Sequence, residues 1–207
     1  ITVTDNGTGT LADSETFTIS VGEVNDAPTI TSNGGGASAG VTIAENTTAV
    51  ATVTATDADG PSLTYSIAGG ADAARFTIDA STGALGFVTA PNFEAATDSS
   101  ADNVYDVVVQ ASDGALTATQ SLAVGVSNVN EAPTALAPGS AAVNIQALGG
   151  TSVATLVATD PDTGDAISFS LVDDGGGRFA VDAASGQLSV ASGARLDDQG
   201  GTPFVLV

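Results

Sequence analysis

Two short acidic motifs in this sequence could bind a metal cation. Asp57-Ala58-Asp59-Gly60 directly follows a run of apolar and threonine residues, and Asp160-Pro161-Asp162 follows a second run of the same kind. Calcium is bound by several oxygen ligands, and carboxylates clustered in a loop commonly supply them. Asp and Gly also favour plain turns, so each motif taken alone fits either a calcium site or an ordinary loop.

Other polar residues are weaker candidates for metal binding. Asp113 precedes a glycine at the end of another strand-like run, and Asn25-Asp26-Ala27-Pro28 forms an extended connection whose polar side chains could add oxygen ligands. An Asp-Gly turn and a stiff linker explain these residues equally well. Glu45 and Glu94 are single carboxylates, and without further context they are expected on the solvated surface.

The charge balance leaves most of these carboxylates without an ion-pair partner. The 207-residue chain has 24 acidic residues against three basic ones, which gives a formal net charge of -21. Nucleic acid is not an expected partner, because phosphate binding needs Lys and Arg. The excess acidity fits solubility or salt adaptation, or else divalent cations that supply the missing positive charge.

Composition also counts against enzymatic activity. The chain has no Cys and no His, which excludes thiolate metal sites, disulfides and histidine acid–base chemistry. It has no Trp and only two Tyr, so it lacks aromatic surfaces on which a sugar could stack. No apolar run is long enough for a membrane-spanning helix, and direct membrane insertion of this segment is not expected.

The sequence repeats itself at offsets of 103 to 105 residues. Four segments recur in the same order: 25–29 as 130–134, 50–59 as 153–162, 75–79 as 178–182, and 82–85 as 185–188. A period of this length suits independently folded domains. We therefore divide the chain into the end of one repeat (1–27), a complete repeat (28–132) and a third repeat that is cut short (133–207), as in an excerpt of a longer polypeptide.

Alternating polar and apolar residues predict the secondary structure of the central repeat. Residues 1–5 resemble 108–113, so 1–27 is expected to hold the last two strands of its own repeat. Short strands separated by Gly-containing turns predict an all-β fold, with tandem immunoglobulin-like Greek-key β-sandwiches. The central strands are expected at 41–44, 49–56, 62–68, 75–79, 84–89, 104–112 and 116–126, with one helical turn at 71–75.

Taken together, the motifs resemble cadherin repeats. The resemblance covers the whole chain, is fullest from 25 to 134, and is closest to the cadherin-like repeats of large bacterial surface proteins and adhesins. It implies cadherin-type sandwiches with calcium held at the junctions between repeats. The motifs that carry it are Glu45-Asn46, Asp57-x-Asp59, Phe93-Glu94, Ser112-Asp113-Gly114 and Asn130-Glu131-Ala132-Pro133, in that order.

The resemblance also implies which residues bind Ca²⁺. The second junction is the best candidate for an intact site, since the first lacks the glutamates of the preceding repeat. At the first junction the implied ligands are Asn25, Asp26, Asp57, Asp59 and Asp113. At the second they are Glu45, Glu94, Asn130, Glu131, Asp160 and Asp162.

The chain departs from the family pattern at several positions. Asn92 stands where an Asp is common, the linker is one residue shorter than in the vertebrate form, and Glu131 replaces an Asp. In the third repeat, Ala147 and Gln199 stand in place of the two glutamates. A junction after that repeat is therefore expected to bind fewer ions or none.

Calcium at a junction would cancel carboxylate repulsion and cross-link two rigid bodies. We therefore expect a stiff array that is extracellular, on a cell surface or in a secreted protein. The resemblance implies homophilic cell adhesion, with like repeats or other cell-surface proteins as partners, and adhesin roles such as biofilm formation. The main alternative is a metal-independent immunoglobulin-like stalk that carries a distal adhesive or enzymatic domain.

Overall fold

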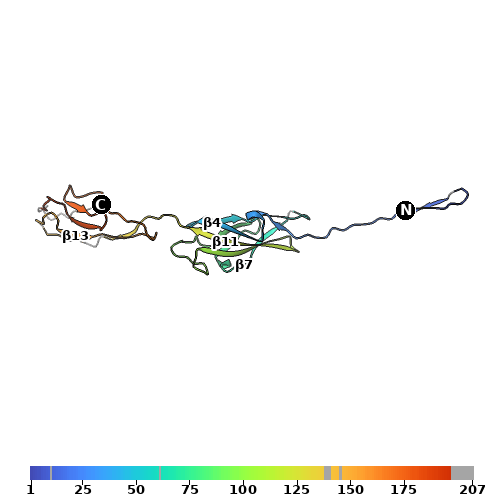
Figure 1. Cartoon of the computed structure of the whole chain (residues 1–207), viewed down its shortest axis with the longest axis horizontal. Helices are drawn as coiled ribbons and strands as arrows, with labels where there is room; N and C mark the ends of the chain where they lie inside the picture. Colours follow the sequence, from blue (N-terminus) through green and yellow to red (C-terminus); the bar gives the residue numbers. More distant parts are fainter. Residues whose placement is uncertain (10, 61, 138–140, 145, 197–207) are drawn as a thin grey trace. The chain divides into compact units, whose positions relative to one another are not determined.

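The computed structural model describes residues 1–9, 11–60, 62–137, 141–144 and 146–196. Strands dominate this part of the chain, and its helical pieces are two short 3-10 turns, η1 (Ser32–Gly34) and η2 (Ala73–Arg75) (Figure 1). The predicted all-β fold class is confirmed. Among the described residues, no helix is long and apolar enough to cross a membrane.

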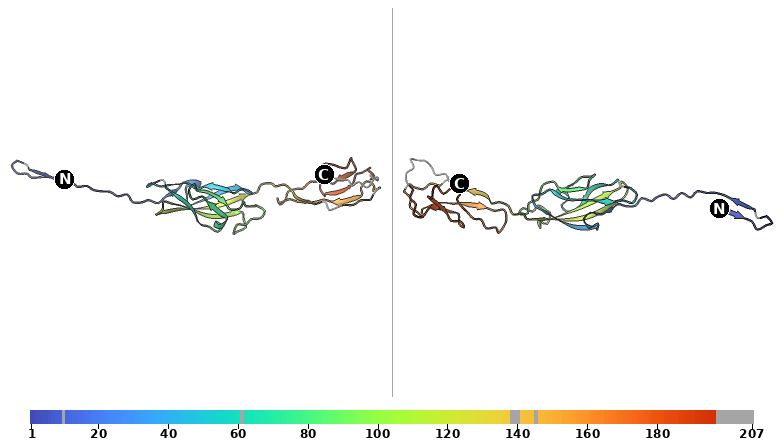
Figure 2. Two further views of the ribbon diagram at one scale, coloured as in Figure 1. Left: turned by 180° about the vertical axis from the view of Figure 1, so that it is seen from behind. Right: turned by 90° about the horizontal axis from the view of Figure 1, so that it is seen from above.

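The central repeat contains a four-stranded sheet and two smaller sheets (Figures 1 and 2). The large sheet has the order β4-β11-β10-β7, formed by β4 (Ser38–Ala44), β11 (Thr117–Ser127), β10 (Val104–Ser112) and β7 (Thr64–Gly69). A three-stranded sheet has the order β5-β9-β8, formed by β5 (Ala49–Thr52), β9 (Ala84–Phe87) and β8 (Phe76–Ile78). The third sheet pairs β3 (Thr29–Ile30) with β6 (Ala55–Thr56).

The core follows from the alternation along β10 and β11. From Tyr105 to Ala111 in β10 and from Gln120 to Val126 in β11, every second residue is buried, while the residues between them are exposed or half-buried. The Phe87 ring meets the Tyr105 ring edge-on, with centroids 5.0 Å apart and planes at 84°. Burial of each large apolar side chain contributes about 1.5–3 kcal/mol. The buried residues of the two strands include Tyr105, Val107, Val109, Ala111, Leu122, Val124 and Val126.

The predicted strand 49–56 is wrong as one element. It divides into β5 and β6, which belong to different sheets. At the break, the Val53 N–H donates to the Gly83 carbonyl (2.8 Å), and the Thr54 carbonyl accepts from the Thr31 N–H (2.8 Å). The apolar alternation continues through the break because Val53 is itself fully buried. The predicted strand 104–112 coincides with β10, and the remaining predicted strands correspond to described ones with at least one shifted end. The turn η2 lies within the predicted helical turn, and β3 was not predicted.

By its internal contacts the chain divides into two compact units. One consists of 1–41, 49–86 and 106–123, and the other of 42–48, 87–105 and 124–207. Strands β4, β10 and β11 contribute residues to both units. The repeat boundaries after residues 27 and 132 stay predictions.

The third repeat reproduces the smaller sheets of the central one. Its strands are β12 (Thr134–Ala137), β13 (Ser152–Thr155), β14 (Val157–Thr159), β15 (Phe179–Val181) and β16 (Gln187–Val190). Their pairing, β12-β14 and β13-β16-β15, matches β3-β6 and β5-β9-β8. Phe179, Leu188, Val190 and Leu196 form its core cluster. The sequence repeat is therefore also a structural repeat, in which β14 stands in place of β6.

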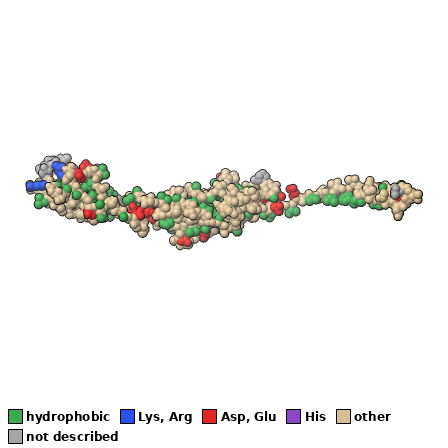
Figure 3. All heavy atoms as spheres, turned by 45° about the horizontal axis from the view of Figure 1, so that its top comes forward, with side chains coloured by type: hydrophobic (Ala, Val, Ile, Leu, Met, Phe, Trp, Pro, Cys, Tyr) green, Lys and Arg blue, Asp and Glu red, His purple; other side chains and the backbone are tan. Residues whose placement is uncertain are grey.

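The first residues form an antiparallel hairpin of β1 (Thr2–Thr4) and β2 (Ala12–Ser14). Val3 is paired with Asp13, and the apolar side chains from Ile1 to Val24 are exposed. In Figure 3, green apolar side chains follow one another along part of this N-terminal segment. The segment thus contains two strands, and their assignment to a preceding repeat stays a prediction.

Gly83 has a conformation and a location that only glycine fits. Its φ is +70°, and a Cβ atom would collide with the Val53 carbonyl oxygen. We expect Gly83→Ala to lower the free energy of unfolding by about 2–4 kcal/mol, because backbone strain and overpacking add. Urea denaturation followed by tyrosine fluorescence measures this, since both tyrosines, Tyr65 and Tyr105, belong to the central repeat.

Gly114 is the matched control for this substitution. Its φ is +101°, but an added Cβ would meet nothing within 4 Å. Gly114→Ala should therefore cost only the strain of a left-handed residue, about 1 kcal/mol. Equal losses in the two variants would show that the contact with Val53 does not matter.

Candidate metal centre

Glu45 is the buried centre of the acidic group predicted for the second junction. It directly follows β4 and is only 1% exposed. Its carboxylate accepts hydrogen bonds from the Phe93 N–H (2.8 Å) and the Val129 N–H (2.9 Å). Phe93 directly precedes Glu94, and Val129 directly precedes Asn130. The two hydrogen bonds therefore place both predicted ligands near Glu45. The expectation that Glu45 lies on the solvated surface is wrong, because its oxygens are paired with backbone donors.

Glu45, Glu94 and Glu131 converge. One carboxylate oxygen from each of the three lies within 4.8 Å of the others. Desolvation raises the pKa of Glu94, and the negative charges of Glu45, Glu131 and Asp162 raise it further against the opposing effect of its own backbone N–H. The group contains no basic residue, so its carboxylates repel one another unless a proton or a cation is bound.

The loop that carries Glu94 is fastened by Asp98, which is 7% exposed. Asp98 Oδ2 accepts from the N–H groups of Ser100 (3.2 Å) and Asp102 (3.0 Å), and Oδ1 accepts from the Asn103 N–H (3.1 Å). The Asn103 side-chain amide in turn donates to the Phe93 carbonyl (2.9 Å). This network fixes the segment next to Glu94 without any metal.

The linker connects this group to the loop after β14. The Glu131 N–H donates to Asp162 Oδ2 (2.6 Å), and the Asp162 N–H donates to Asp160 Oδ1 (3.0 Å). Asn130 closes the linker by donating its side-chain amide to the Glu131 carbonyl (3.3 Å). All six residues predicted for the second junction therefore belong to one connected set.

Asp165 is a further acidic residue of this loop that the sequence prediction missed. The carboxylates of Asp160, Asp162 and Asp165 each have one oxygen within 4.8 Å of the others. The Asp165 N–H also donates to the Asp162 carbonyl (3.3 Å). The spacing of the two repeats could have indicated it. Asp160 lies 103 residues after its counterpart Asp57, whereas Phe169 lies 104 residues after its counterpart Tyr65. The third repeat therefore has one extra residue in this loop.

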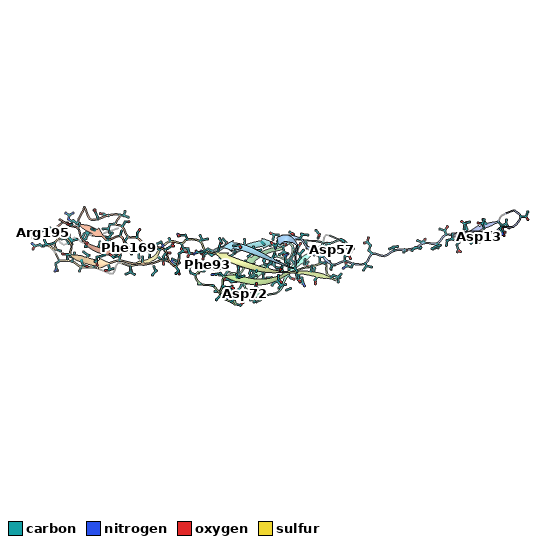
Figure 4. The ribbon with its side chains drawn as sticks, in the orientation of Figure 1. Asp13, Asp57, Asp72, Phe93, Phe169 and Arg195 are labelled. Carbon is teal, nitrogen blue, oxygen red and sulfur yellow. The ribbon has the colours of Figure 1, made fainter. Side chains whose placement is uncertain are left out.

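The acidic group predicted for the first junction repeats the same hydrogen-bond pattern after β6. The Asp26 N–H donates to Asp59 Oδ2 (2.5 Å), and the Asp59 N–H donates to Asp57 Oδ1 (2.8 Å). The Asn25 side-chain amide donates to Asp113 Oδ2 (2.8 Å) and to the Asp26 carbonyl (3.2 Å). All five residues predicted for the first junction are thus brought together; Asp57 is labelled in Figure 4.

Hydrogen bonds to Asp113 favour the charged form of its carboxyl group. Hydrogen bonds from the N–H groups of Leu116 and Ala115, and from the Asn25 amide, lower the pKa of Asp113 against a smaller effect of burial. Its Oδ2 receives the Asn25 amide, whereas its Oδ1 receives the two backbone donors. The loop after β10 is thereby joined to the linker.

Each group contains one buried carboxylate oxygen without a hydrogen-bond partner. In the loop after β6 this atom is Asp57 Oδ2, and in the loop after β14 it is Asp162 Oδ1. A buried, unpaired carboxylate oxygen is costly, so it is expected to face a cation or water. An all-oxygen donor set of carboxylates and carbonyls suits a hard cation such as Ca²⁺. The residues present therefore fit calcium.

Comparisons with known proteins support the fold. No family model and no curated protein sequence matches the chain. Among solved structures, the protocadherin gamma B4 extracellular domain is 28% identical, with 96% of this chain and 34% of that chain covered and a TM-score of 0.51. A protocadherin gamma B7 EC3-6 cis-dimer structure is 26% identical, with 96% and 50% covered and a TM-score of 0.51.

Human protocadherin-24 EC1-2 shares the fold at 22% identity, with 84% of this chain and 80% of that chain covered and a TM-score of 0.56. The chain spans between a third and a half of the length of the two gamma protocadherin chains. The fold is therefore that of cadherin extracellular domains, as the resemblance implied. The bacterial surface-protein origin stays a prediction.

Protonation of Asp98 should loosen the loop next to Glu94. Burial would raise the pKa of Asp98, but hydrogen bonds from the Asp102 N–H, the Ser100 hydroxyl and the Asn103 N–H together lower it below the ordinary value of 3.8. A depressed pKa contributes stability that is complete above the ordinary value and is lost as the pH falls through the folded-state value. We expect Asp98→Asn to lower the melting temperature in chelator at neutral pH.

The same variant should lose less stability than the wild type on acidification from about pH 5 to about pH 3. Melting followed by tyrosine fluorescence at each pH measures the difference. Asp106→Asn, which removes an exposed carboxylate from the same repeat, is the control. Parallel pH profiles for wild type and Asp98→Asn would contradict the assigned role of Asp98.

Proposed function

We propose that this chain is a calcium-binding segment of a cadherin-like extracellular protein, in which Ca²⁺ stiffens the connections around its two acidic groups. The observation that carries the proposal is the pair of buried, unpartnered carboxylate oxygens, Asp57 Oδ2 and Asp162 Oδ1, one in each group. In both loops, backbone N–H groups donate to some carboxylate oxygens. A second set of oxygens, which includes Asp57 Oδ2 and Asp162 Oδ1, is left for a cation. Calcium would complete that second set.

Calcium would act as a cross-link because its ligands come from separate segments. Around Glu45 they come from the end of β4, the loop after β9, the linker and the loop after β14. A cation bound there would cancel the carboxylate repulsion that, together with desolvation, raises the pKa of Glu94, and it would hold four segments together. Extracellular calcium modules bind with dissociation constants of about 10⁻⁴ to 10⁻³ M. A hundredfold excess of calcium over that constant adds about 2.7 kcal/mol per site.

The proposed location is the cell surface or a secreted protein. The solved structures that resemble the chain are extracellular domains, and one of them is described as a cis-dimer. Like repeats are accordingly the proposed partners, in homophilic adhesion or as a spacer that carries a distal domain. A metal-independent stalk is the alternative that the calcium experiments exclude or establish, and no catalytic role is proposed.

Calcium should raise the melting temperature of the wild-type chain, and chelator should reverse the rise. Glu94→Gln and Asp162→Asn should each remove part of this gain, because each takes a charged ligand from the group around Glu45. Asp173→Asn is the matched control, since Asp173 is an exposed acid whose carboxylate, among the described residues, accepts from the nearby Gly175 N–H. Calorimetric scans with calcium, magnesium and chelator give the comparison.

Magnesium should stabilise the chain less than calcium, because it demands tighter octahedral geometry. Limited proteolysis with a protease of broad specificity should cut near Asn130 faster in chelator than in calcium. Equal melting and equal cutting with and without calcium would establish the metal-independent stalk instead.

Asp165 should be a calcium ligand of the loop after β14. Asp165→Asn removes one charge from the Asp160, Asp162 and Asp165 set while keeping the residue's size, so we expect a weaker calcium affinity by about three- to tenfold. Isothermal titration of the full chain measures the change. An affinity equal to that of Asp173→Asn would remove Asp165 from the ligand set and leave Asp160 and Asp162 in it.

A further inference from the structure

We propose that Asn46 is a positioning residue that orients the Glu131 carboxylate for calcium, so that a glutamate can serve at the second junction. The inference rests on the proposed function, because it concerns the same group of carboxylates. Asn46 Nδ2 donates to Glu131 Oε1 at 2.8 Å. Asn46 is the second residue after β4, and Glu131 is in the linker, 85 residues later.

The backbone holds Asn46 in a fixed place. Its φ is +60°, a left-handed conformation that Asn adopts more readily than most residues. Its N–H donates to the Pro91 carbonyl (2.9 Å), and the Thr47 hydroxyl donates to the Ala44 carbonyl (2.7 Å). The preceding residue is Glu45, whose buried carboxylate has two backbone donors. The Asn46 amide is therefore presented from a tightly bonded turn.

Glu131 is held from two directions. Its backbone N–H is fixed by Asp162 Oδ2 (2.6 Å), and its Oε1 is fixed by Asn46. Its side chain has three rotatable bonds, and a flexible glutamate loses more conformational freedom on binding a metal than a shorter aspartate does. An amide that already holds one oxygen removes part of this cost before calcium arrives.

A neutral donor suits this role better than a charged one. A Lys or Arg in place of Asn46 would pair with the carboxylates and oppose the entry of a divalent cation. An amide offers a hydrogen bond without positive charge and leaves the net charge of Glu45, Glu94 and Glu131 unchanged. In the third repeat, Ala147 and Leu148 align with Glu45 and Asn46, so the buried acid and the orienting amide are absent together.

A double-mutant cycle tests this role. Asn46→Gly removes the amide and tolerates the left-handed backbone, and Glu131→Ala removes its partner. Calcium affinity is measured by isothermal titration of the full chain that also carries Asp57→Ala and Asp59→Ala, so that the group around Glu45 gives the signal. We expect Asn46→Gly to raise the dissociation constant about fivefold, and to have no further effect when Glu131 is already Ala.

The control is Gln146→Gly. Gln146 is also an exposed polar residue, and its backbone is also left-handed, with a φ of +67°. In chelator, Asn46→Gly should lower the melting temperature no more than this control does. A fivefold loss that persists in Glu131→Ala, or a stability loss in chelator with unchanged affinity, would overturn the inference and give Asn46 a purely structural role. If the Asp57→Ala, Asp59→Ala chain takes up no calcium before any change at Asn46, the proposed function of this group fails instead.

Discussion

The carboxylate of Glu45 accepts hydrogen bonds from the backbone N–H groups of Phe93 and Val129, and the remaining candidate site depends on these two contacts. An ionised carboxylate that is 1% exposed is costly unless its oxygens are paired. Here the pairing also brings the segments of Glu94 and Asn130 to the end of β4. The acid therefore has a structural role of its own, which does not depend on the proposed calcium binding.

The sandwich makes this arrangement repeatable. The apolar alternation determines which residues of each strand are buried. Because this fixes where the strand ends, it also determines where the residues of the following loop lie. Asp57 follows β6 and Asp160 follows β14, and both loops use the same hydrogen bonds from linker N–H to the second Asp. Because the backbone supplies the contacts, the linker residue can change from Asp26 to Glu131 without losing the pattern.

Most of the fold could be predicted from the sequence, because strand alternation and glycine-containing turns are local signals. The break between β5 and β6 could not, since Val53 continues the apolar pattern while its backbone bonds Gly83. The predicted ligands depended on the family resemblance rather than on any single motif. The burial of Glu45 was beyond the sequence because its partners are backbone groups about fifty and eighty residues away. Asp165 and the Asn46–Glu131 contact required the loop geometry itself.

The acidity of the chain has a different meaning in these groups than on the open surface. An isolated surface carboxylate is solvated and costs the fold little, whereas the carboxylate of Glu94, although exposed, has a raised pKa because it is partly desolvated and lies near three other acidic groups. Asp98 and Asp113 show the opposite case, in which several donors lower the pKa and the fold uses the charge directly. The same residue type therefore either stabilises a loop through several N–H donors or lies among other carboxylates with few donors, where the proposed calcium would compensate its charge. Under the proposed function, segments of the second kind would gain stability as the concentration of free calcium rises, and the stiffness of the chain would then depend on its surroundings as well as on its sequence.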